Sequence, residues 1–431
     1  MENTAFVDHE KFFDCVHCGL CLASCPTYVE LGTEMDSPRG RIVMLRALQE
    51  GHAQLNDEVV GHLDLCLGCR ACETACPSGV QYGELIEGAR PFIEQHYRRP
   101  VLERGKRWLM NKTFPNPWGA RLFALFLKVG AALGLARFAH SEAVPATLRY
   151  WFGLLPERGS VSSTPLLEHY PAIGEKRHTV AVLSGCVMST VFGATNQSTV
   201  KVLRHNGCEV LIPKAQSCCG ALLLHNGEKQ AALALAKRNI DIFDQLDLDA
   251  LIINAAGCGA MMKEYGELFK DDPAYREKAA RLTEKMKDVA EFVGSIALRT
   301  PTREVRVKAT YHDACHLAHG QGVREQPRAL LRAIPGLRLT NLPESDWCCG
   351  SAGTYNLTQP EMAARLLERK VGNIQATEAD VVVTGNPGCL MQIQAGLRQR
   401  GLPMKAVHTM DLLALAYEDE PEIDRSSQGG S

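Results

Sequence analysis

Eight of the 17 cysteines in this chain stand in two copies of one short pattern, C-x2-C-x2-C-x3-C-P. The first copy consists of Cys15, Cys18, Cys21 and Cys25 before Pro26, and the second of Cys66, Cys69, Cys72 and Cys76 before Pro77. Three thiols placed two residues apart can face one point from a single loop, and the proline then fixes φ and turns the chain away. The pattern therefore requires two tight, thiol-rich loops in the fold.

The start and the charge of the chain indicate what so many thiols are for. The chain has 431 residues and begins MENTAFVDHEKFF, which has neither the cationic n-region nor the apolar h-region of a signal peptide. In a large chain of a reducing compartment, cysteines at this spacing are metal ligands rather than disulfides, so we expect a cytoplasmic protein. With 47 basic and 49 acidic residues the net charge is −2. No basic field would attract nucleic acid, and we expect no nucleic-acid partner.

The spacing of both runs is that of bacterial ferredoxins. There, each run supplies three ligands to one [4Fe–4S] cluster and its fourth cysteine to the other cluster. This crossing rule predicts two [4Fe–4S] clusters in the first hundred residues. The first would be held by Cys15, Cys18, Cys21 and Cys76, and the second by Cys66, Cys69, Cys72 and Cys25. Tetrahedral zinc is the alternative, but zinc sites are built from paired cysteines rather than from repeated triplets with a fourth cysteine.

About 40 residues separate the two runs, and residues 37–51 within them show apolar positions at helical spacing. This spacer is longer than in a minimal two-cluster ferredoxin. It resembles the α-helical ferredoxin domain in the iron–sulfur subunits of succinate-dehydrogenase-type enzymes. Arg39, Arg41 and Arg46 would offset the charge of a cluster if they faced one, but we expect them on the solvated face of the helix.

The second half of the chain, from about residue 179 to residue 418, is an internal repeat. Its first copy contains Cys186, Cys218, Cys219 and Cys258, and its second copy contains Cys315, Cys348, Cys349 and Cys389. Matching cysteines lie 129 to 131 residues apart. We expect each set to be a candidate site for a further [4Fe–4S] cluster, so that the chain would hold one or two more in addition to the first two. Cysteines packed as small apolar residues are the alternative.

Each of these cysteines follows a short segment rich in β-branched residues, and helical segments such as 228–246 and 360–375 alternate with those segments. Alternation of this kind predicts parallel sheets, whose functional groups gather at the carboxyl ends of the strands. Gly220 and Gly350 follow the two cysteine pairs, and we expect them to let the backbone approach a cofactor closely. Cys208 has no counterpart in the second copy, and we expect it in the core.

The C…CCG…C duplication resembles the cysteine-rich CCG domains of heterodisulfide reductase catalytic subunits. With the motifs CVHCG, SPRGRI, CPSGV and CCGSAGTYNLT, the chain from about residue 10 to residue 415 resembles the iron–sulfur subunits of bacterial glycolate oxidase. The iron–sulfur subunits of anaerobic glycerol-3-phosphate dehydrogenase are the next most similar family. The resemblance implies an α-helical ferredoxin domain followed by two repeated α/β domains with parallel sheets.

The same resemblance implies a function. Electrons would come from a partner subunit, an FAD-binding 2-hydroxy acid dehydrogenase that oxidises glycolate to glyoxylate or D-lactate to pyruvate. They would leave to a membrane quinone or another acceptor. No G-x-G-x-x-G or Walker A motif occurs, so we expect neither a flavin site nor a nucleotide site, and no substrate-converting site, on this chain.

One departure from the family pattern bears on the alternatives. The fullest CCG motif ends in C-x2-C and supplies five thiolates, but here Ala255 and Asn386 replace the first cysteine of that pair. This weakens the case for a second function, a thiol–disulfide catalyst of the heterodisulfide reductase type. A third possibility is a scaffold whose second half binds no metal and only docks the flavoprotein.

Several other features have simpler interpretations. His17, His312, His316 and His319 stand beside the cysteines, and we expect them to make local hydrogen bonds. Lys128 lies in the middle of the apolar segment 119–139, so the uninterrupted apolar run is too short to span a bilayer. We expect a core or linker helix there. The alternative is an interfacial helix, which would hold the chain peripherally on the cytoplasmic face of the inner membrane. The predicted parts are a ferredoxin domain (1–100), a helical linker (101–178), CCG copies (179–300 and 301–418) and a disordered tail (419–431).

Overall fold

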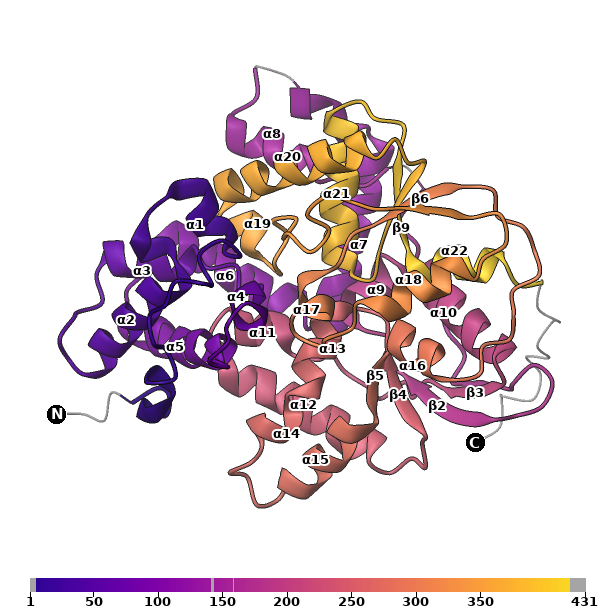
Figure 1. Cartoon of the computed structure of the whole chain (residues 1–431), viewed down its shortest axis with the longest axis horizontal. Helices are drawn as coiled ribbons and strands as arrows, with labels where there is room; N and C mark the ends of the chain where they lie inside the picture. Colours follow the sequence, from indigo (N-terminus) through magenta and orange to yellow (C-terminus); the bar gives the residue numbers. More distant parts are fainter. Residues whose placement is uncertain (1–4, 141–142, 158, 419–431) are drawn as a thin grey trace.

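The computed structural model describes residues 5–140, 143–157 and 159–418, so the predicted disordered tail, 419–431, lies outside the described residues. Its N-terminal part is built of helices and turns and lies at one end of the molecule, drawn in indigo and violet (Figure 1). Its helices are η1 (His9–Phe12), α1 (Pro26–Leu31), η2 (Glu34–Asp36), α2 (Pro38–Gln49), α3 (Asp57–Asp64), α4 (Ala71–Thr74) and α5 (Tyr82–His96).

Helix α2 is the helix expected between the two cysteine runs. Ser37 caps it by accepting a hydrogen bond from the N–H of Gly40, and Pro38 occupies its first turn, where a missing N–H costs nothing. Its apolar side buries Leu45 and packs on α5 around Leu85. This packing brings cysteines of both runs against one small core.

A helical segment connects this part to the rest of the chain. It contains α6 (Val101–Thr113), α7 (Pro117–Ala132), η3 (Leu135–His140) and α8 (Ala146–Gly153). Helix α7 turns one side, with Ala124 and Leu127, toward the second half of the chain and leaves the other side exposed. Among the described residues, no helix is both long and apolar enough to cross a membrane.

Two sheets form the centre of the second half. The first has the strand order β1-β3-β2-β4-β5 and the second β7-β6-β8-β9, so four strands of each follow the same order. Every pair is parallel except β1 with β3. The strands are β1 (His169–Tyr170), β2 (His178–Val182), β3 (Cys208–Leu211), β4 (Ala250–Ile253), β5 (Met286–Asp288), β6 (Lys308–Tyr311), β7 (Arg338–Thr340), β8 (Val381–Thr384) and β9 (Lys405–His408). The predicted fold class, a helical domain followed by two repeated α/β units, is confirmed.

Helices surround both sheets (Figure 1). The first unit contains α9 (Cys186–Thr190), α10 (Gly193–His205), α11 (Ala221–His225), α12 (Lys229–Phe243), α13 (Ala256–Lys263), α14 (Tyr265–Leu268), α15 (Arg276–Lys285) and α16 (Val289–Ser295). The second contains α17 (Cys315–Ala318), α18 (Glu325–Arg332), α19 (Tyr355–Thr358), α20 (Pro360–Ala376), α21 (Pro387–Gln399) and α22 (Thr409–Leu415).

The two α/β units share one hydrophobic core. Val180 and Ile252 of the first sheet belong to the same buried cluster as Tyr311, Val383 and Met410 of the second unit. The ferredoxin part contacts both units, because α5 packs on α11 and α1 packs on α20. All three parts therefore meet along one edge, and this is where the cysteines of the repeats lie.

Candidate metal centres

The first predicted cysteine set lines one cavity at the end of the molecule. Cys15, Cys18, Cys21 and Cys76 border this cavity together with Cys72, Arg39 and Tyr82. His17 and Gly19 hold the loop with φ values of 56° and 84°. This left-handed backbone reverses the chain between successive cysteines. Cys18 is exposed, so this set lies next to solvent.

The second loop repeats the backbone of the first, 51 residues later. Gly68 and Arg70 have φ values of 62° and 63°, at the positions that match His17 and Gly19. Burial raises the pKa of Cys72 well above its ordinary value, and the thiols of Cys69, Cys66 and Cys25 add to the shift, because each lies close enough to oppose ionisation. Cys66, Cys69, Cys72 and Cys25 therefore lie close together.

Two donors face the sulfur of Cys66. Its Sγ accepts a hydrogen bond from the Tyr82 hydroxyl at 3.5 Å and another from the N–H of Gly68 at 3.4 Å. Hydrogen bonds to the sulfurs are among the features by which proteins set the potential of an iron–sulfur cluster. This loop is thus equipped to stabilise a thiolate.

Arg41 is the residue whose sequence-based interpretation was wrong. We expected a solvated side chain, yet its side chain is 1% exposed and its Nη1 lies 4.0 Å from the Sγ of Cys25. Asp36 accepts from its Nη2 at 3.4 Å, Thr27 from its Nη1 at 3.0 Å, and the carbonyl of His62 from its Nε at 2.8 Å. These acceptors satisfy a buried guanidinium. Arg41 therefore brings a positive charge to the second cysteine set.

In the first repeat, four thiols gather where three strands end. Cys186 begins α9 after β2, Cys218 and Cys219 follow β3, and Cys258 lies in α13 after β4. The Sγ atoms of Cys186 and Cys218 are 3.5 Å apart. The thiols of Cys218 and Cys258 both raise the pKa of Cys219, while hydrogen bonding with Cys186 and Cys219 lowers the pKa of Cys218. The four sulfurs therefore form one contiguous group.

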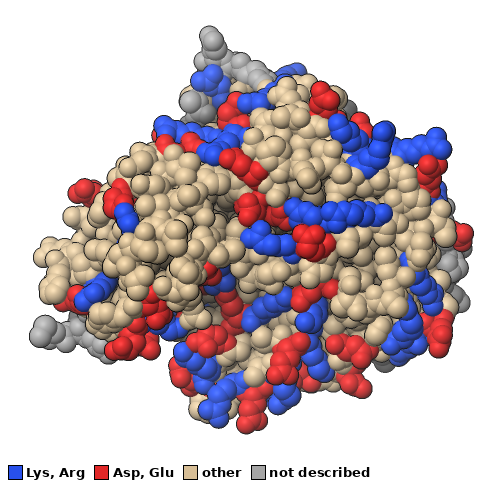
Figure 2. All heavy atoms as spheres, viewed as in Figure 1, with Lys and Arg blue, Asp and Glu red and all other residues tan. Residues whose placement is uncertain are grey.

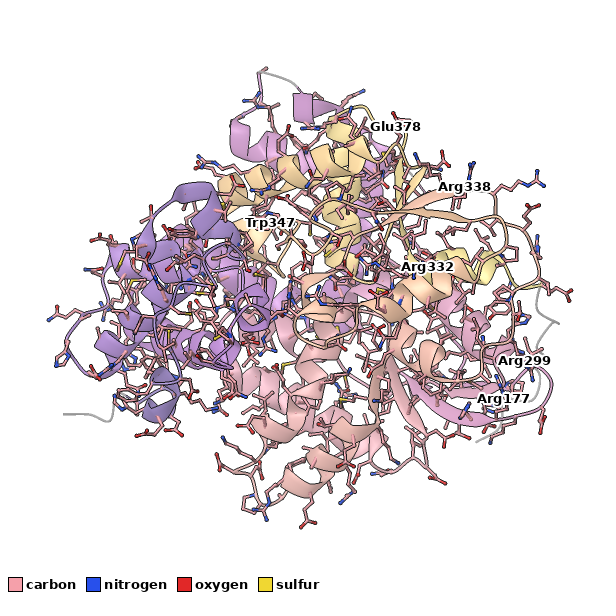
Figure 3. The ribbon with its side chains drawn as sticks, viewed as in Figure 1. Arg177, Arg299, Arg332, Arg338, Trp347 and Glu378 are labelled. Atoms are coloured by element: carbon pink, nitrogen blue, oxygen red, sulfur yellow. The ribbon has the colours of Figure 1, made fainter. Side chains whose placement is uncertain are left out.

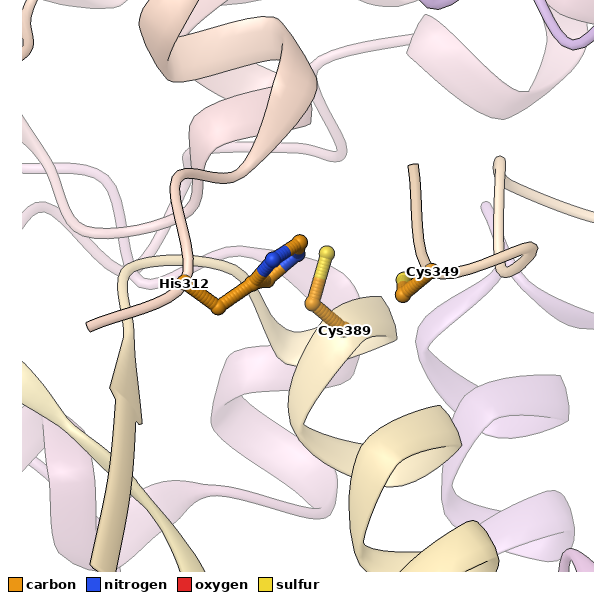
Figure 4. Close-up of side chains that lie close together, drawn as sticks. All are labelled: His312, Cys349 and Cys389. Atoms are coloured by element: carbon orange, nitrogen blue, oxygen red, sulfur yellow. The ribbon is translucent and has the colours of Figure 1, made fainter. Parts of the chain in front are cut away.

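The second repeat gathers its thiols in the same way. Cys315 begins α17 after β6, Cys348 and Cys349 follow β7, and Cys389 lies in α21 after β8. The Cys315 thiol neighbours Cys348, and the Cys349 thiol neighbours Cys389. His312 adds a ring nitrogen, which lies within 4.8 Å of the Sγ atoms of Cys349 and Cys389 (Figure 4). Burial lowers the pKa of His312 to about 3, so its ring is neutral.

The residues of all four groups fit iron–sulfur clusters. Each group offers four thiols, the number that a [4Fe–4S] cluster takes, and every one of the 17 cysteines is free of disulfides. Burial raises the pKa of Cys69 and of Cys72 well above the ordinary range. Thiolates in such surroundings need a metal as counter-charge.

The group that contains Cys69 and the group that contains Cys315 adjoin each other. Cys69 and Cys315 belong to one buried cluster with Cys348 and Leu67, and the Cys315 thiol is the next cause, after burial, of the raised pKa of Cys69. Trp347, which packs on this cluster, lies beside the ferredoxin part (Figure 3). The two repeats are also joined at their sites, because α13, which carries Cys258, packs on α17.

The glycines after the two cysteine pairs each lie close to a helix. Gly220 and Gly350 have φ values of 89° and 83°. A Cβ at Gly350 would lie 2.6 Å from the carbonyl oxygen of Ala363 in α20, and one at Gly220 would lie 3.0 Å from that of Ala232 in α12. Both glycines therefore allow a left-handed turn against a helix, and the helix carbonyl leaves no room for a side chain.

The remaining predicted residues are placed as follows. Cys208 lies in β3, outside the four cysteine groups, and is fully buried, as expected for a core residue. His17 lies 3.9 Å from the Sγ of Cys15, His316 lies 3.5 Å from that of Cys315, and His319 bonds to the hydroxyl of Thr74 at 2.9 Å. Sequence reasoning missed the approach of His312 to its cysteines. The sequence does distinguish this position, because His312 of the second repeat matches Leu183 of the first.

Comparisons with known proteins agree with this architecture. Residues 11–80 match a family described as a 4Fe-4S dicluster domain, and residues 180–263 and 309–394 match one described as a cysteine-rich domain. The chain is 40% identical to the probable glycolate oxidase iron-sulfur subunit of Bacillus subtilis and 35% identical to the glycolate oxidase iron-sulfur subunit of Escherichia coli, over 94% of each chain in both cases. It is also 32% identical to lactate utilization protein A of an Exiguobacterium species, over 54% of this chain and 96% of that protein. The chain belongs to the family of glycolate oxidase iron–sulfur subunits.

Proposed function

We propose that this chain is the electron-transfer subunit of a glycolate-oxidising complex. A partner subunit that binds FAD would oxidise glycolate to glyoxylate and pass the electrons to this chain, which would deliver them to a membrane quinone or a similar acceptor. D-Lactate is the second candidate substrate, because relatives named lactate utilization protein A align with about half of the chain. The packing of Cys69 of the ferredoxin part against the buried cluster that contains Cys315 of the second repeat is the observation that carries the proposal.

Four sets of cysteines would hold the clusters. A bound [4Fe–4S] cluster accepts and releases single electrons, which suits a chain without a substrate site. The sets are Cys15, Cys18, Cys21 and Cys76; Cys66, Cys69, Cys72 and Cys25; Cys315, Cys348, Cys349 and Cys389; and Cys186, Cys218, Cys219 and Cys258. Cys72 borders the cavity of the Cys15 set, and Cys69 packs against the cluster that contains Cys315. Helix α13, which carries Cys258, packs on α17, which begins at Cys315, and so joins the last two sets. This order supports a continuous route through the chain.

The solvent-exposed end of this route suits a protein partner. Phe13, Val16 and Leu20 surround the first cysteine loop and are 50%, 67% and 60% exposed. Exposed apolar side chains grouped in this way mark interaction surfaces. Figure 2 shows few charged side chains over this end of the molecule, while acidic and basic side chains alternate elsewhere on the same face. We assign this end to the flavoprotein subunit.

The other end of the route lies near a surface that suits anionic lipid. Helix α7 packs on α9, which begins at Cys186. The outer sides of α6 and α7 expose large apolar side chains: Val101, Leu102, Trp108, Leu109, Trp118, Leu122, Leu125, Phe126 and Val129. The exposed charged residues of these helices are all basic: Arg104, Lys106, Lys112, Arg121 and Lys128. Glu103, their single acidic residue, pairs with Arg99 and Arg107.

Two features of α6 and α7 favour lipid over a protein partner. Exposed tryptophans beside leucines and basic residues are typical of helices that lie in the membrane interface. A basic surface without exposed carboxylates also complements anionic headgroups. We therefore propose a peripheral position on the cytoplasmic face of the inner membrane, with α6 and α7 in the interface.

The route is tested by metal content. The full chain, reconstituted without oxygen, is expected to hold about 12 to 16 irons, at four per cluster. Replacing Cys348 and Cys349 by serine should remove about four, whereas Cys208→Ser, which changes a buried thiol outside the sets, should remove none. About eight irons in the parent, unchanged in the double variant, would refute the part of the route in the second half.

The partner and the membrane are tested separately. Glycolate should bleach the visible absorption of the co-purified complex, and D-lactate is the comparison substrate. The full chain should co-sediment with vesicles that contain phosphatidylglycerol but not with phosphatidylcholine alone. Leu125→Glu combined with Phe126→Glu should abolish this binding, and Val43→Glu, an exposed position on α2, should leave it unchanged. Equal binding by both variants would exclude α7 as the lipid surface.

A further inference from the structure

The two repeats differ at one buried position beside their thiols. His312 ends the segment after β6, three residues before Cys315, and Leu183 stands three residues before Cys186. Both side chains are almost fully buried, at 0% and 1% exposure. A leucine at this place needs no partner, whereas an imidazole does. The partners of His312 therefore indicate why the second repeat has it.

One nitrogen of His312 has a partner and the other has none among the described residues. Nδ1 lies 3.0 Å from the carbonyl oxygen of Ser345, which can only accept, so Nδ1 carries the proton and donates it. Nε2 then carries a lone pair, and it is buried without a hydrogen-bond partner. An orphaned polar atom in a core costs free energy unless something binds it. A ring held at one nitrogen by a backbone carbonyl, with the other nitrogen free, is the usual arrangement of a metal-binding histidine.

The ring is aimed at the thiols. A ring nitrogen of His312 and the Sγ atoms of Cys349 and Cys389 lie within 4.8 Å of one another, and all three residues are buried (Figure 4). Since Nδ1 is committed to Ser345, Nε2 is the nitrogen available to a metal. The family's fifth cysteine would stand at Asn386, whose side-chain amide instead donates to Cys389 at 3.5 Å. His312 thus reaches the cysteine set from another strand end.

We propose that His312 supplies a fifth ligand atom, Nε2, to the metal group of the second repeat. This repeat would then bind iron through imidazole and thiolate together, while the first repeat, with Leu183, would use thiolates alone. An imidazole is neutral where a thiolate is negative, and histidine ligands raise the potential of iron–sulfur centres. The two repeats would therefore hold chemically different centres. The inference rests on the proposed function, since it requires a cluster in the second repeat.

The test is spectroscopic and begins with the unmodified chain. Full-length protein is labelled with ¹⁵N-histidine, reconstituted without oxygen and poised where the centre of the second repeat is paramagnetic, and pulsed electron paramagnetic resonance then detects any directly bound nitrogen. We expect a large ¹⁵N coupling that disappears in His312→Leu. This substitution places in the second repeat the residue that the first repeat already accommodates. The matched control is His316→Leu, which changes a half-buried histidine 3.5 Å from Cys315 and should keep the coupling.

The outcomes separate this inference from the proposed function. About 12 to 16 irons per chain with the coupling present, and lost only in His312→Leu, support both. The same iron content without a directly bound nitrogen overturns the fifth ligand and leaves the proposed function standing. About eight irons, with no coupling, overturns the fifth ligand and the part of the route in the second half, because the second repeat then holds no cluster. The labelled parent chain decides among these outcomes even if His312→Leu fails to fold.

Discussion

Arg41 provides the sharpest test of the second cysteine set. Its guanidinium is buried beside Cys25 and Asp36, and we consider its replacement by glutamine. At an effective dielectric constant of about 20, two unit charges 4.0 Å apart interact by about 4 kcal/mol. At about 2.3 kcal/mol per 100 mV, this corresponds to about 180 mV. The added electron is spread over the cluster, so 180 mV is an upper bound, and we expect Arg41→Gln to lower the reduction potential by tens of millivolts or more.

The same substitution should also destabilise the fold. Asp36 is 3% exposed and would lose its cationic partner, although His62 still lies 2.8 Å away. Breaking a buried ion pair costs about 3–5 kcal/mol. Arg41→Lys keeps the charge but not the planar fork of donors, so it should lose stability while its potential stays close to that of the parent.

Redox titration followed by visible absorption measures the potential, and denaturant unfolding measures the stability. The control is Arg46→Gln, on the same helix, whose partner is the surface residue Glu50. It removes the same charge at a solvent-exposed position, so neither quantity should change much. An Arg41→Gln variant with the potential of the parent, or a higher one, would refute the placement of Arg41 beside a cluster.

Three further predictions concern stability. Burial raises the pKa of Cys208 from an ordinary value near 9 to about 12. The contribution of this thiol to the free energy of unfolding is therefore complete below pH 9 and is lost as the pH rises through 12. Between pH 8 and pH 11, the free energy of unfolding of Cys208→Ala should therefore fall by about 3 kcal/mol less than that of the parent, as measured by denaturant unfolding at each pH. Gly350→Ala should lower the melting temperature far more than Gly322→Ala, because both have positive φ but only Gly350 faces a backbone oxygen; equal effects would contradict this. Ile252→Ala should cost about 2–5 kcal/mol in denaturant unfolding, as expected for a fully buried strand residue.

Much of the fold was accessible from the sequence because the patterns are local. Runs such as ALII of β4 and VVVT of β8 are apolar, β-branched and bounded by turn residues, and they form the central strands. Strand β5 (Met286–Asp288) and strand β9 (Lys405–His408) were not predicted. Both are short edge strands that contain charged residues, and their pairing depends on β4 and β8, which lie far away in the sequence.

The candidate sites could be predicted from the sequence where a single run of residues supplies them. Spacing grouped the cysteines within each of the first two runs, since x2 spacing constrains a loop directly. It did not predict that Arg41 would be buried, because Thr27, Asp36 and His62 make that position polar only after α1, η2 and α3 pack around it. A charged residue at helical spacing is normally solvated, and the exception depends on tertiary contacts.

The duplication helps to distinguish residues that the fold requires from residues that it does not, because two copies of one backbone carry partly different side chains. Where the copies agree, the fold accounts for the residue: Gly220 and Gly350 both have left-handed φ and both meet a helix carbonyl. Where they differ at a buried position, the fold cannot be the reason, since the same backbone accepts either side chain. Leu183 and His312 are such a pair, and the polar member has a nitrogen without a partner, aimed at two thiols. A requirement local to the second repeat then accounts for the histidine, and a metal held by those thiols would use the free lone pair.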